Sequence, residues 1–281
     1  MVKAIVKKLM RVSERGLKKV LKISKTGTKI LNFIELRKFA FTACNGCFFK
    51  YVDKPFRRKT VDRVYCDAFN EVFILAKSLP LKGDIFEFGV FAGYTSLLFA
   101  KKINEFRFRD TSLHLFDSFI GLPEAVELDK NSYEFASGVW TEGSMRVCEG
   151  LDKYVHKKLA KILPNDRIHV IKGFFEDTLD AYFKNLNKKA KIVHIDCDLY
   201  SSSKYVLDFL FKNEIIQDGT FIIFDDWMTS LGNPNLGQRK ATQEILEMYP
   251  HWSLEKYLNY GIGSHVFIAH DLRVTNVSLE K

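Results

Sequence analysis

Asp84–Gly93 has the sequence D-I-F-E-F-G-V-F-A-G, an apolar run that ends in a turn containing glycine. The segment that follows, Tyr94–Ile103, is helix-like. A short apolar run closed by a turn is typical of a buried parallel strand, and small residues in the turn let a ligand approach the backbone at the next helix N-terminus. This stretch predicts a strand–turn–helix unit that cradles a nucleotide-like ligand.

The order Glu87, Gly89, Gly93 differs from the G-x-G-x-x-G pattern of dinucleotide-binding turns, which argues against NAD. An acid on the strand and widely spaced glycines suit a ligand that carries both an amino acid and a nucleoside. S-adenosylmethionine is such a ligand. By itself, however, a glycine turn after a strand more often serves only to close a strand–helix connection.

Apolar runs and helical spacing extend this pattern along the chain. They predict further strands at 114–119, 167–173, 191–196 and 219–224, and helices over 61–76, 94–103 and 151–163. Alternating strands and helices predict a right-handed, mostly parallel, doubly wound sheet, a Rossmann-like α/β fold. In such folds ligands bind outside the carboxyl ends of the strands.

Acidic residues follow these strand ends: Asp117, Asp196, Asp198, Asp225 and Asp226. An acid after the second strand is expected to accept hydrogen bonds from ribose hydroxyls, which assigns Asp117 to the cofactor. Any single acid could instead cap a helix, as Asp196 or Asp198 could cap one starting near Ser201. The whole set is better explained as a metal site, because clustered carboxylates select magnesium or another oxygen-seeking cation. Such a cation makes a bound hydroxyl easier to deprotonate.

The charge of the chain is concentrated at its start. Residues 1–34 hold ten Lys or Arg and one acid, which equals the net +9 of all 281 residues. The neutral remainder is not expected to bind nucleic acid. Apolar residues at near-helical spacing predict a basic helical arm that contacts an anionic membrane or a partner protein, although a solvated arm or a lid is the simpler interpretation.

The remaining composition bounds the class of protein. A chain of this length with 47% apolar residues can bury one large core. Five scattered cysteines are no disulfide framework, and Cys44-Asn-Gly-Cys47 is half a zinc site without a second half. No window suits a membrane-spanning helix or a secretory signal, which predicts a cytoplasmic protein, peripheral at the membrane if the arm binds there. We expect a basic arm with a linker or lid over residues 1–59 and a single domain over residues 60–281. A homo-oligomer is compatible with the sequence, which does not decide the oligomeric state.

Six ordered blocks resemble the macrocin O-methyltransferase family over about residues 60–270: D-I-F-E-F-G-V-F-A-G, H-L-F-D-S-F-I-G-L-P-E, K-G-F-F-E-D-T-L, H-I-D-C-D-L-Y-S-S-S, F-I-I-F-D-D-W and G-Q-R-K-A. The resemblance implies a class I methyltransferase fold with a mostly parallel seven-stranded sheet and helices on both faces. The basic arm is not part of the family pattern. The turn residues Phe91-Ala92 also differ from those of many relatives.

The resemblance also implies an activity, the methylation of a hydroxyl group on a sugar or glycosylated small molecule by S-adenosylmethionine. It assigns a magnesium ion to Asp196, Asp225 and Asp226, with Asp198 as the candidate base. His194 is a second candidate base, although a strand histidine is more often packed in the core. The candidate cofactor residues are Glu87, Gly89, Gly93, Thr95, Asp117, Ser118, Gly173, Phe174 and Asp196.

Two other interpretations stay open. Asp196-Cys-Asp198 after an apolar strand is also the D-x-D pattern of a metal-dependent nucleotide-sugar glycosyltransferase, and the chain could be a non-catalytic module that docks through its arm. The irregular stretches 124–150 and 228–240 are the candidate substrate loops, and they do not reveal the substrate.

Overall fold

The computed structural model describes residues 55–147, 149–184 and 186–274. The predictions for the basic arm and for Cys44 and Cys47 fall on residues outside these ranges. Two of the five cysteines, Cys66 and Cys197, lie within them and carry free thiols.

A seven-stranded sheet with strand order β3-β2-β1-β4-β5-β7-β6 forms the centre of the domain. Its strands are β1 (Asp84–Phe88), β2 (Leu113–Asp117), β3 (Ile168–Lys172), β4 (Ala190–Ile195), β5 (Phe221–Phe224), β6 (Trp252–Tyr260) and β7 (Ser264–Asp271). The first five pair in parallel, whereas β7 pairs antiparallel with both β5 and β6. The predicted mostly parallel, doubly wound sheet is confirmed.

Burial explains why the central strands have apolar sequences. Every residue of β1, β4 and β5 is buried, because helices cover both faces of a parallel sheet. The sequence pattern does not predict the β6–β7 hairpin, because only the two end residues of β6 are buried at the sheet edge and β6 therefore shows no continuous apolar run.

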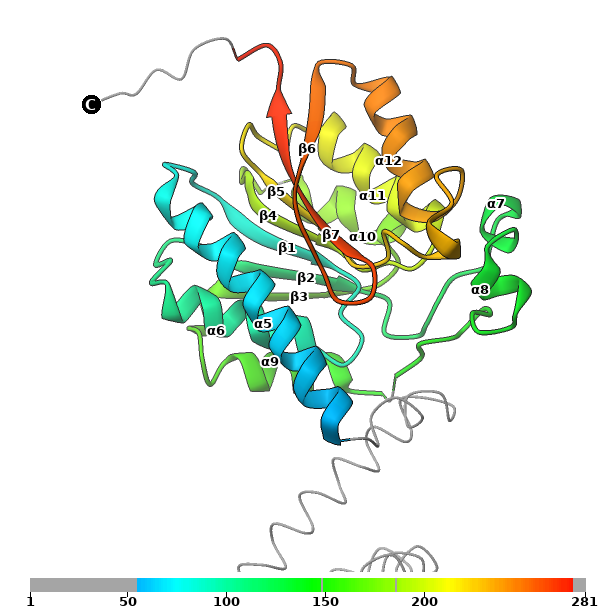
Figure 1. Cartoon of the computed structure of the whole chain (residues 1–281). Coiled ribbons are helices and arrows are strands. Elements are labelled where there is room, and N and C mark those ends of the chain that lie inside the picture. Colours follow the sequence, from blue (N-terminus) through cyan, green and yellow to red (C-terminus); the bar gives the residue numbers. More distant parts are fainter. Residues whose placement is uncertain (1–54, 148, 185, 275–281) are drawn as a thin grey trace, which may run out of the picture. The chain divides into compact units, whose positions relative to one another are not determined.

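Helices cover the two faces in separate groups (Figure 1). One face carries α5 (Pro55–Ser78), α6 (Tyr94–Glu105) and α9 (Leu151–Leu159), and the other carries α10 (Phe175–Phe183), α11 (Tyr200–Lys212) and α12 (Gly237–Met248). Short helices lie in the connections: α7 (Glu127–Lys130), α8 (Tyr133–Ala136), η1 (Asn165–Arg167) and η2 (Ser230–Gly232).

Three predicted boundaries need correction. The first helix starts at Pro55 rather than Val61, because proline is well accommodated in the first turn of a helix, so part of the expected linker is helical. The helix expected to reach Leu163 ends at Leu159. The stretch 124–150, expected to be irregular, contains α7 and α8, which are too short to show a helical period.

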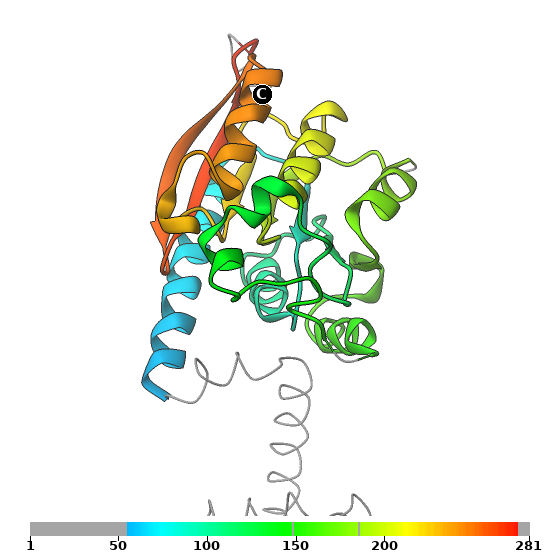
Figure 2. The same ribbon diagram turned by 90° about the vertical axis from the view of Figure 1, so that its right-hand side faces the viewer.

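The carboxyl ends of the parallel strands meet at one edge of the sheet, and Figure 2 looks onto that edge with α7 and α8 in front. Aromatic packing fixes the strands on both faces: Phe88 stacks on Phe116 with ring centroids 5.0 Å apart, and Phe69 of α5 stacks on Phe99 of α6 at 4.6 Å. The loops at this edge therefore project from a closely packed sheet and helix layer.

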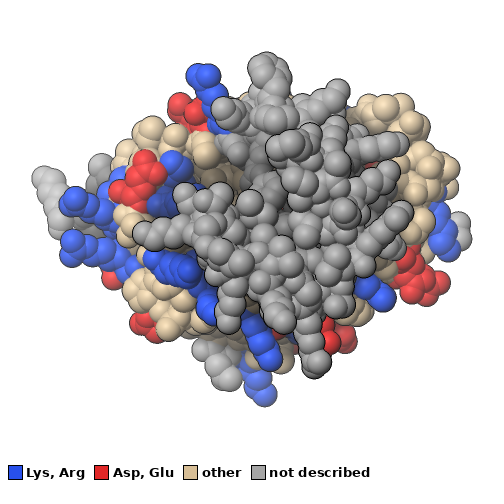
Figure 3. Space-filling view, turned by 90° about the horizontal axis from the view of Figure 1, so that it is seen from below, with Lys and Arg blue, Asp and Glu red and all other residues tan. Residues whose placement is uncertain are grey.

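The visible part of the face in Figure 3 carries both basic and acidic side chains, in line with the neutral balance of residues 35–281. Within the described ranges, no helix combines the length and the apolar character needed to cross a membrane.

Candidate active site

The turn after β1 brings the ends of β1 and β4 into backbone contact. Gly89 has φ 91°, and a Cβ there would lie 1.7 Å from the carbonyl oxygen of Asp196. The Asp196 amide also donates to the Phe88 carbonyl at 2.8 Å. Only glycine fits this approach. Glycine is needed at position 93 for a different reason. Gly93 is the N-cap of α6 with φ 74°, and a Cβ at this position would lie 2.9 Å from the side chain of Val155 in α9.

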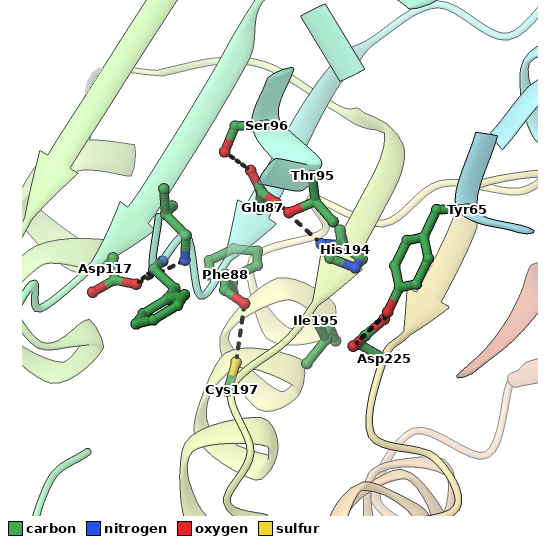
Figure 4. A network of polar contacts seen from close by, with 12 residues as sticks. Tyr65, Glu87, Phe88, Thr95, Ser96, Asp117, His194, Ile195, Cys197 and Asp225 are labelled. Carbon is green, nitrogen blue, oxygen red and sulfur yellow. Dashed lines mark hydrogen bonds and ion pairs between the residues drawn. The ribbon is translucent and has the colours of Figure 1, made fainter. Parts of the chain in front are cut away.

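Glu87 lies in the interior, behind the turn (Figure 4). Its two carboxylate oxygens accept hydrogen bonds from the hydroxyls of Thr95 and Ser96 in the first turn of α6. Glu87 therefore anchors the first turn of α6, and the Thr95 hydroxyl donates its proton within this contact. Both side chains are buried, and direct cofactor contacts by these two residues stay a prediction.

His194 is buried completely in the same interior cluster. Its ring packs edge-on to Phe69 and Phe99, and its Nδ1 lies 3.3 Å from Glu87 Oε1 without forming a hydrogen bond. A general base must reach the proton it removes. The structure thus gives His194 the packed-core position and does not present it as a base.

Asp117 connects the end of β2 to the turn after β1. Its Oδ2 accepts from the backbone amides of Val90 at 2.7 Å and Phe91 at 2.8 Å, and its Oδ1 accepts from Phe119 at 2.6 Å. A carboxylate has about four acceptor positions, so one remains for a ribose hydroxyl. Asp117 is half-buried, and its predicted cofactor contact is compatible with this shaping role.

The other cofactor candidates have local roles in the loops after β2 and β3. Ser118 donates to the Gly121 carbonyl at 2.9 Å and so closes its own turn. Gly173 has φ 148°, and its amide donates to the Asp117 carbonyl at 3.0 Å, while Phe174 is the N-cap of α10. These residues border the same sheet edge as Asp117.

Asp196, Asp225 and Asp226 converge at the ends of β4 and β5. Each offers a carboxylate oxygen, and the three oxygens all lie within 4.8 Å of one another. The Asp225 amide donates to the Ile195 carbonyl at 3.0 Å, which sets β5 beside β4. All three side chains are half-buried, so the cluster is shielded but reachable.

Gln238 and Asp198 hold Asp226 in place through hydrogen bonds. The buried Gln238 accepts from the Asp226 amide at 3.0 Å and donates to the Ile195 carbonyl at 2.9 Å. The Asp198 amide donates to Asp226 Oδ2 at 3.1 Å from a left-handed backbone with φ 62°. A non-glycine residue in that region is uncommon and recurs where a site constrains the chain.

Burial and mutual repulsion raise the pKa values of Asp196, Asp198 and Asp226. Burial first, then the neighbouring carboxylates, raises the pKa of Asp196 and of Asp226 well above the usual range. The same causes raise the pKa of Asp198 to about 7. A divalent cation would relieve this repulsion, and an all-oxygen donor set fits magnesium rather than zinc. The residues present therefore fit a hard divalent cation.

The helix-capping alternative for Asp196 and Asp198 is wrong. The N-cap of α11 is Leu199, with no side-chain cap. The buried Asp129 of α7 instead accepts from the Ser201 amide at 3.2 Å and from its hydroxyl at 2.6 Å. The strand-end acids are thereby free of that structural role.

Sequence reasoning missed several residues around the cluster. Tyr65, Tyr260 and Ser264 donate to Asp225, and burial before any other cause raises the pKa of both tyrosines, so they remain donors. Glu134 of α8 accepts from the amide and the hydroxyl of Ser230, both at 2.9 Å, and so joins the two candidate substrate loops. Tyr65 had only the signal of an apolar helix position, whereas Gln238 lay in the quoted G-Q-R-K-A block.

Comparison with known proteins agrees with this arrangement. The family model for macrocin O-methyltransferase (TylF) matches residues 65–246. A Streptomyces olivaceus protein, 8-demethyl-8-(2,3-dimethoxy-α-L-rhamnosyl)-tetracenomycin-C 4′-O-methyltransferase, is 26% identical over 160 residues. That alignment covers 55% of this chain and 56% of the relative, so it spans about half of the relative's length.

Solved structures show the same fold. The calicheamicin methyltransferase CalS11 superposes with a TM-score of 0.62 at 19% identity, covering 90% of each chain. The apo structure of CalS11, described as a TDP-rhamnose 3′-O-methyltransferase, gives 0.53 at 19% identity over 90% of this chain and 92% of that one.

The sheet order and the strand-end site define a class I methyltransferase fold, the fold of enzymes that use S-adenosylmethionine. Within that class, the chain belongs to the macrocin O-methyltransferase family. Family membership and fold disfavour the glycosyltransferase interpretation of Asp196-Cys-Asp198.

Proposed function

We propose that this protein transfers a methyl group from S-adenosylmethionine to a hydroxyl group of a sugar or glycosylated small molecule, with a divalent cation held by Asp196, Asp225 and Asp226. The observation that carries the proposal is the convergence of these three carboxylates beside the Gly89 turn, at the sheet edge where such folds bind ligands. The name of the curated relative specifies the 4′-oxygen of a rhamnosyl group, which supports a sugar hydroxyl as acceptor.

The cofactor would occupy the edge formed by the turn after β1 and by Asp117. When bound, S-adenosylmethionine supplies an electrophilic methyl group and the cation supplies positive charge at the acceptor oxygen. The three carboxylates would hold the cation and so fix the position of the acceptor, and orientation is a large part of the rate enhancement in two-substrate reactions.

Asp198 is the proposed base. A pKa of about 7 suits a carboxylate that must accept a hydroxyl proton near neutral pH, although cation binding would lower it. Its left-handed backbone directs its amide to Asp226, which ties the base to the cation site. The loops joined by Glu134 and Ser230 border this edge and would enclose the acceptor.

The proposal is tested with labelled S-adenosylmethionine and a panel of glycosylated small molecules and nucleotide sugars, with and without EDTA. We expect label transfer to at least one sugar hydroxyl, and loss of transfer in EDTA that magnesium restores. Stabilisation by a nucleotide sugar diphosphate with none by S-adenosylhomocysteine, measured by thermal shift, would favour a glycosyltransferase. Full turnover in EDTA would remove the cation from the mechanism.

A further inference from the structure

We propose that Tyr65, supported by Tyr260 and Ser264, is a positioning residue that fixes the Asp225 carboxylate for cation binding. The inference rests on the proposed function, because it assigns a role to groups that surround the proposed cation site. It also links helix α5, which precedes the whole sheet, to the chemistry at the strand ends.

Three hydroxyl groups converge on one carboxylate. The Tyr65 hydroxyl donates to Asp225 Oδ1 at 2.8 Å and lies 3.1 Å from Oδ2 (Figure 4). The Ser264 hydroxyl lies 3.0 Å from Oδ1 and 3.0 Å from the Asp225 carbonyl oxygen, so its one proton is donated to Asp225 at either oxygen, and the Tyr260 hydroxyl lies 3.5 Å from Oδ1. The donors therefore gather at Oδ1 and leave Oδ2 as the oxygen with spare acceptor capacity.

The donors come from three separate elements, α5, β6 and β7, and aromatic packing joins α5 to β6. Tyr65 of α5 meets Tyr260 of β6 edge-to-face, with centroids 5.0 Å apart at 83°, and Tyr260 is 7% exposed. Phe69 packs against both rings, at 6.2 and 6.0 Å. Edge-to-face rings are a preferred geometry, so the direction of the Tyr65 hydroxyl is set by packing.

The chemistry of the donors suits a carboxylate that must stay charged. In the described part of the chain, no Lys or Arg forms an ion pair with any of the three acids. Hydroxyl donors hold Asp225 in place without cancelling its negative charge, whereas an arginine would compete with the cation. Outer groups of this kind orient metal ligands, and their loss typically weakens metal affinity 10- to 100-fold.

The three acids differ in how they are held. Among the described residues, the Asp196 carboxylate receives no side-chain hydrogen bond, and Asp226 receives one from the Asp198 amide. Asp225 is thus the acid whose orientation depends on other side chains. Its supporting set reaches back to Tyr65, 160 residues earlier in the chain.

A simpler explanation is that the Tyr65–Asp225 bond only attaches α5 to the sheet. Removing the Tyr65 hydroxyl would then lower thermal stability and leave cation affinity unchanged. A matched control exists in Tyr249, which follows the end of α12, is also half-buried and donates its hydroxyl to Asp208 of α11 at 2.7 Å.

The experiment measures Mn²⁺ binding to the full-length protein at pH 8 by electron paramagnetic resonance of the free ion. Tyr65→Phe is expected to weaken Mn²⁺ binding 10- to 100-fold, and Ser264→Ala in the same direction. Tyr249→Phe should change it less than twofold. Calorimetric affinity for S-adenosylhomocysteine should stay within twofold in all variants, which verifies that each one is folded.

The outcomes separate the two proposals. If the unsubstituted protein binds no Mn²⁺, the cation part of the proposed function fails and the inference fails with it. If the unsubstituted protein binds Mn²⁺ and Tyr65→Phe binds it equally well, the inference alone is overturned and Tyr65 is an anchor of α5. Should Tyr65→Phe fail to fold, Ser264→Ala decides by the same criterion.

Discussion

Asp196 connects the turn after β1 to the acidic cluster, and so links the proposed cofactor edge to the proposed cation site. Its amide donates to the Phe88 carbonyl and its own carbonyl lies against Gly89, while its side chain joins Asp225 and Asp226. At the residue scale, side-chain and backbone roles can therefore be separated by substitution.

Asp196→Asn keeps the shape of the side chain and removes its charge. We expect loss of stabilisation by magnesium in thermal shift and loss of methyl transfer even with excess magnesium, because the cation loses one of its anionic ligands. Calorimetric affinity for S-adenosylhomocysteine should be nearly unchanged. A variant that retains full magnesium stabilisation would show that Asp196 is not a ligand.

Gly89→Ala tests the backbone contact. The new Cβ would collide with the Asp196 carbonyl at a positive φ, so unfolding free energy should fall by at least about 3 kcal/mol. Gly138→Ala is the control, since it also has positive φ (72°) but a Cβ there meets no atom within 4 Å. It should lose only about 1 kcal/mol. Equal losses in urea denaturation would contradict the close approach.

Asp117→Ala removes the acceptor of three turn amides together with the predicted ribose contact. We expect S-adenosylhomocysteine affinity to fall by about 1 to 3 kcal/mol. Asp117→Asn, which keeps one acceptor oxygen, should lose less. Calorimetry checks both variants, and unchanged affinity in the alanine variant would remove Asp117 from the cofactor site.

At the scale of elements, the ends of β4 and β5 form the acidic cluster and helix α12 secures it through Gln238. Adjacent parallel strands place their carboxyl ends side by side, so acids at those ends are forced together. The raised pKa values follow from this arrangement and give the cluster a pH dependence.

Cation affinity should rise with pH through about 7. At lower pH a cation must compete with protons for the cluster, because burial and carboxylate repulsion raise the pKa of Asp198 to about 7 and the pKa of Asp196 and of Asp226 well above the usual range. Each proton displaced weakens binding by about tenfold per pH unit. Magnesium titrations by calorimetry between pH 6 and 8.5 should show this slope, and a pH-independent affinity would contradict the raised values.

Metal-free protein should show the matching effect on stability. The folded cluster has raised pKa values and holds protons more tightly than the unfolded chain, so its contribution to unfolding free energy is present at low pH and lost as pH rises through about 7. Saturating magnesium should flatten this dependence, as urea denaturation in EDTA and in magnesium would reveal.

At the scale of the whole molecule, every candidate site residue lies between Tyr65 and Ser264, whereas the net charge of the chain comes from residues 1–34. Catalysis and surface association are therefore expected to be separable along the chain.

Deleting residues 1–31 should leave S-adenosylhomocysteine affinity and methyl transfer intact, because α5 and everything after it remain. Association of the full-length chain with anionic vesicles should be salt-sensitive and should disappear on deletion. Calorimetry and co-sedimentation check the two parts. Loss of cofactor binding in the shortened chain would show instead that the basic arm acts as a lid.

The residue pattern is sufficient to predict the five parallel strands and the edge at which they end, but not the β6–β7 hairpin. Alternating apolar runs and helices allow few other folds, and parallel strands necessarily end at one edge, so Asp117, Asp196, Asp225 and Asp226 had to gather there. Packing between distant segments sets the direction of each side chain. It turned Glu87, Thr95 and His194 inward and brought Tyr65, Tyr260 and Ser264 to Asp225, because contacts between residues far apart in the chain depend on how helices and strands pack, which no local pattern encodes.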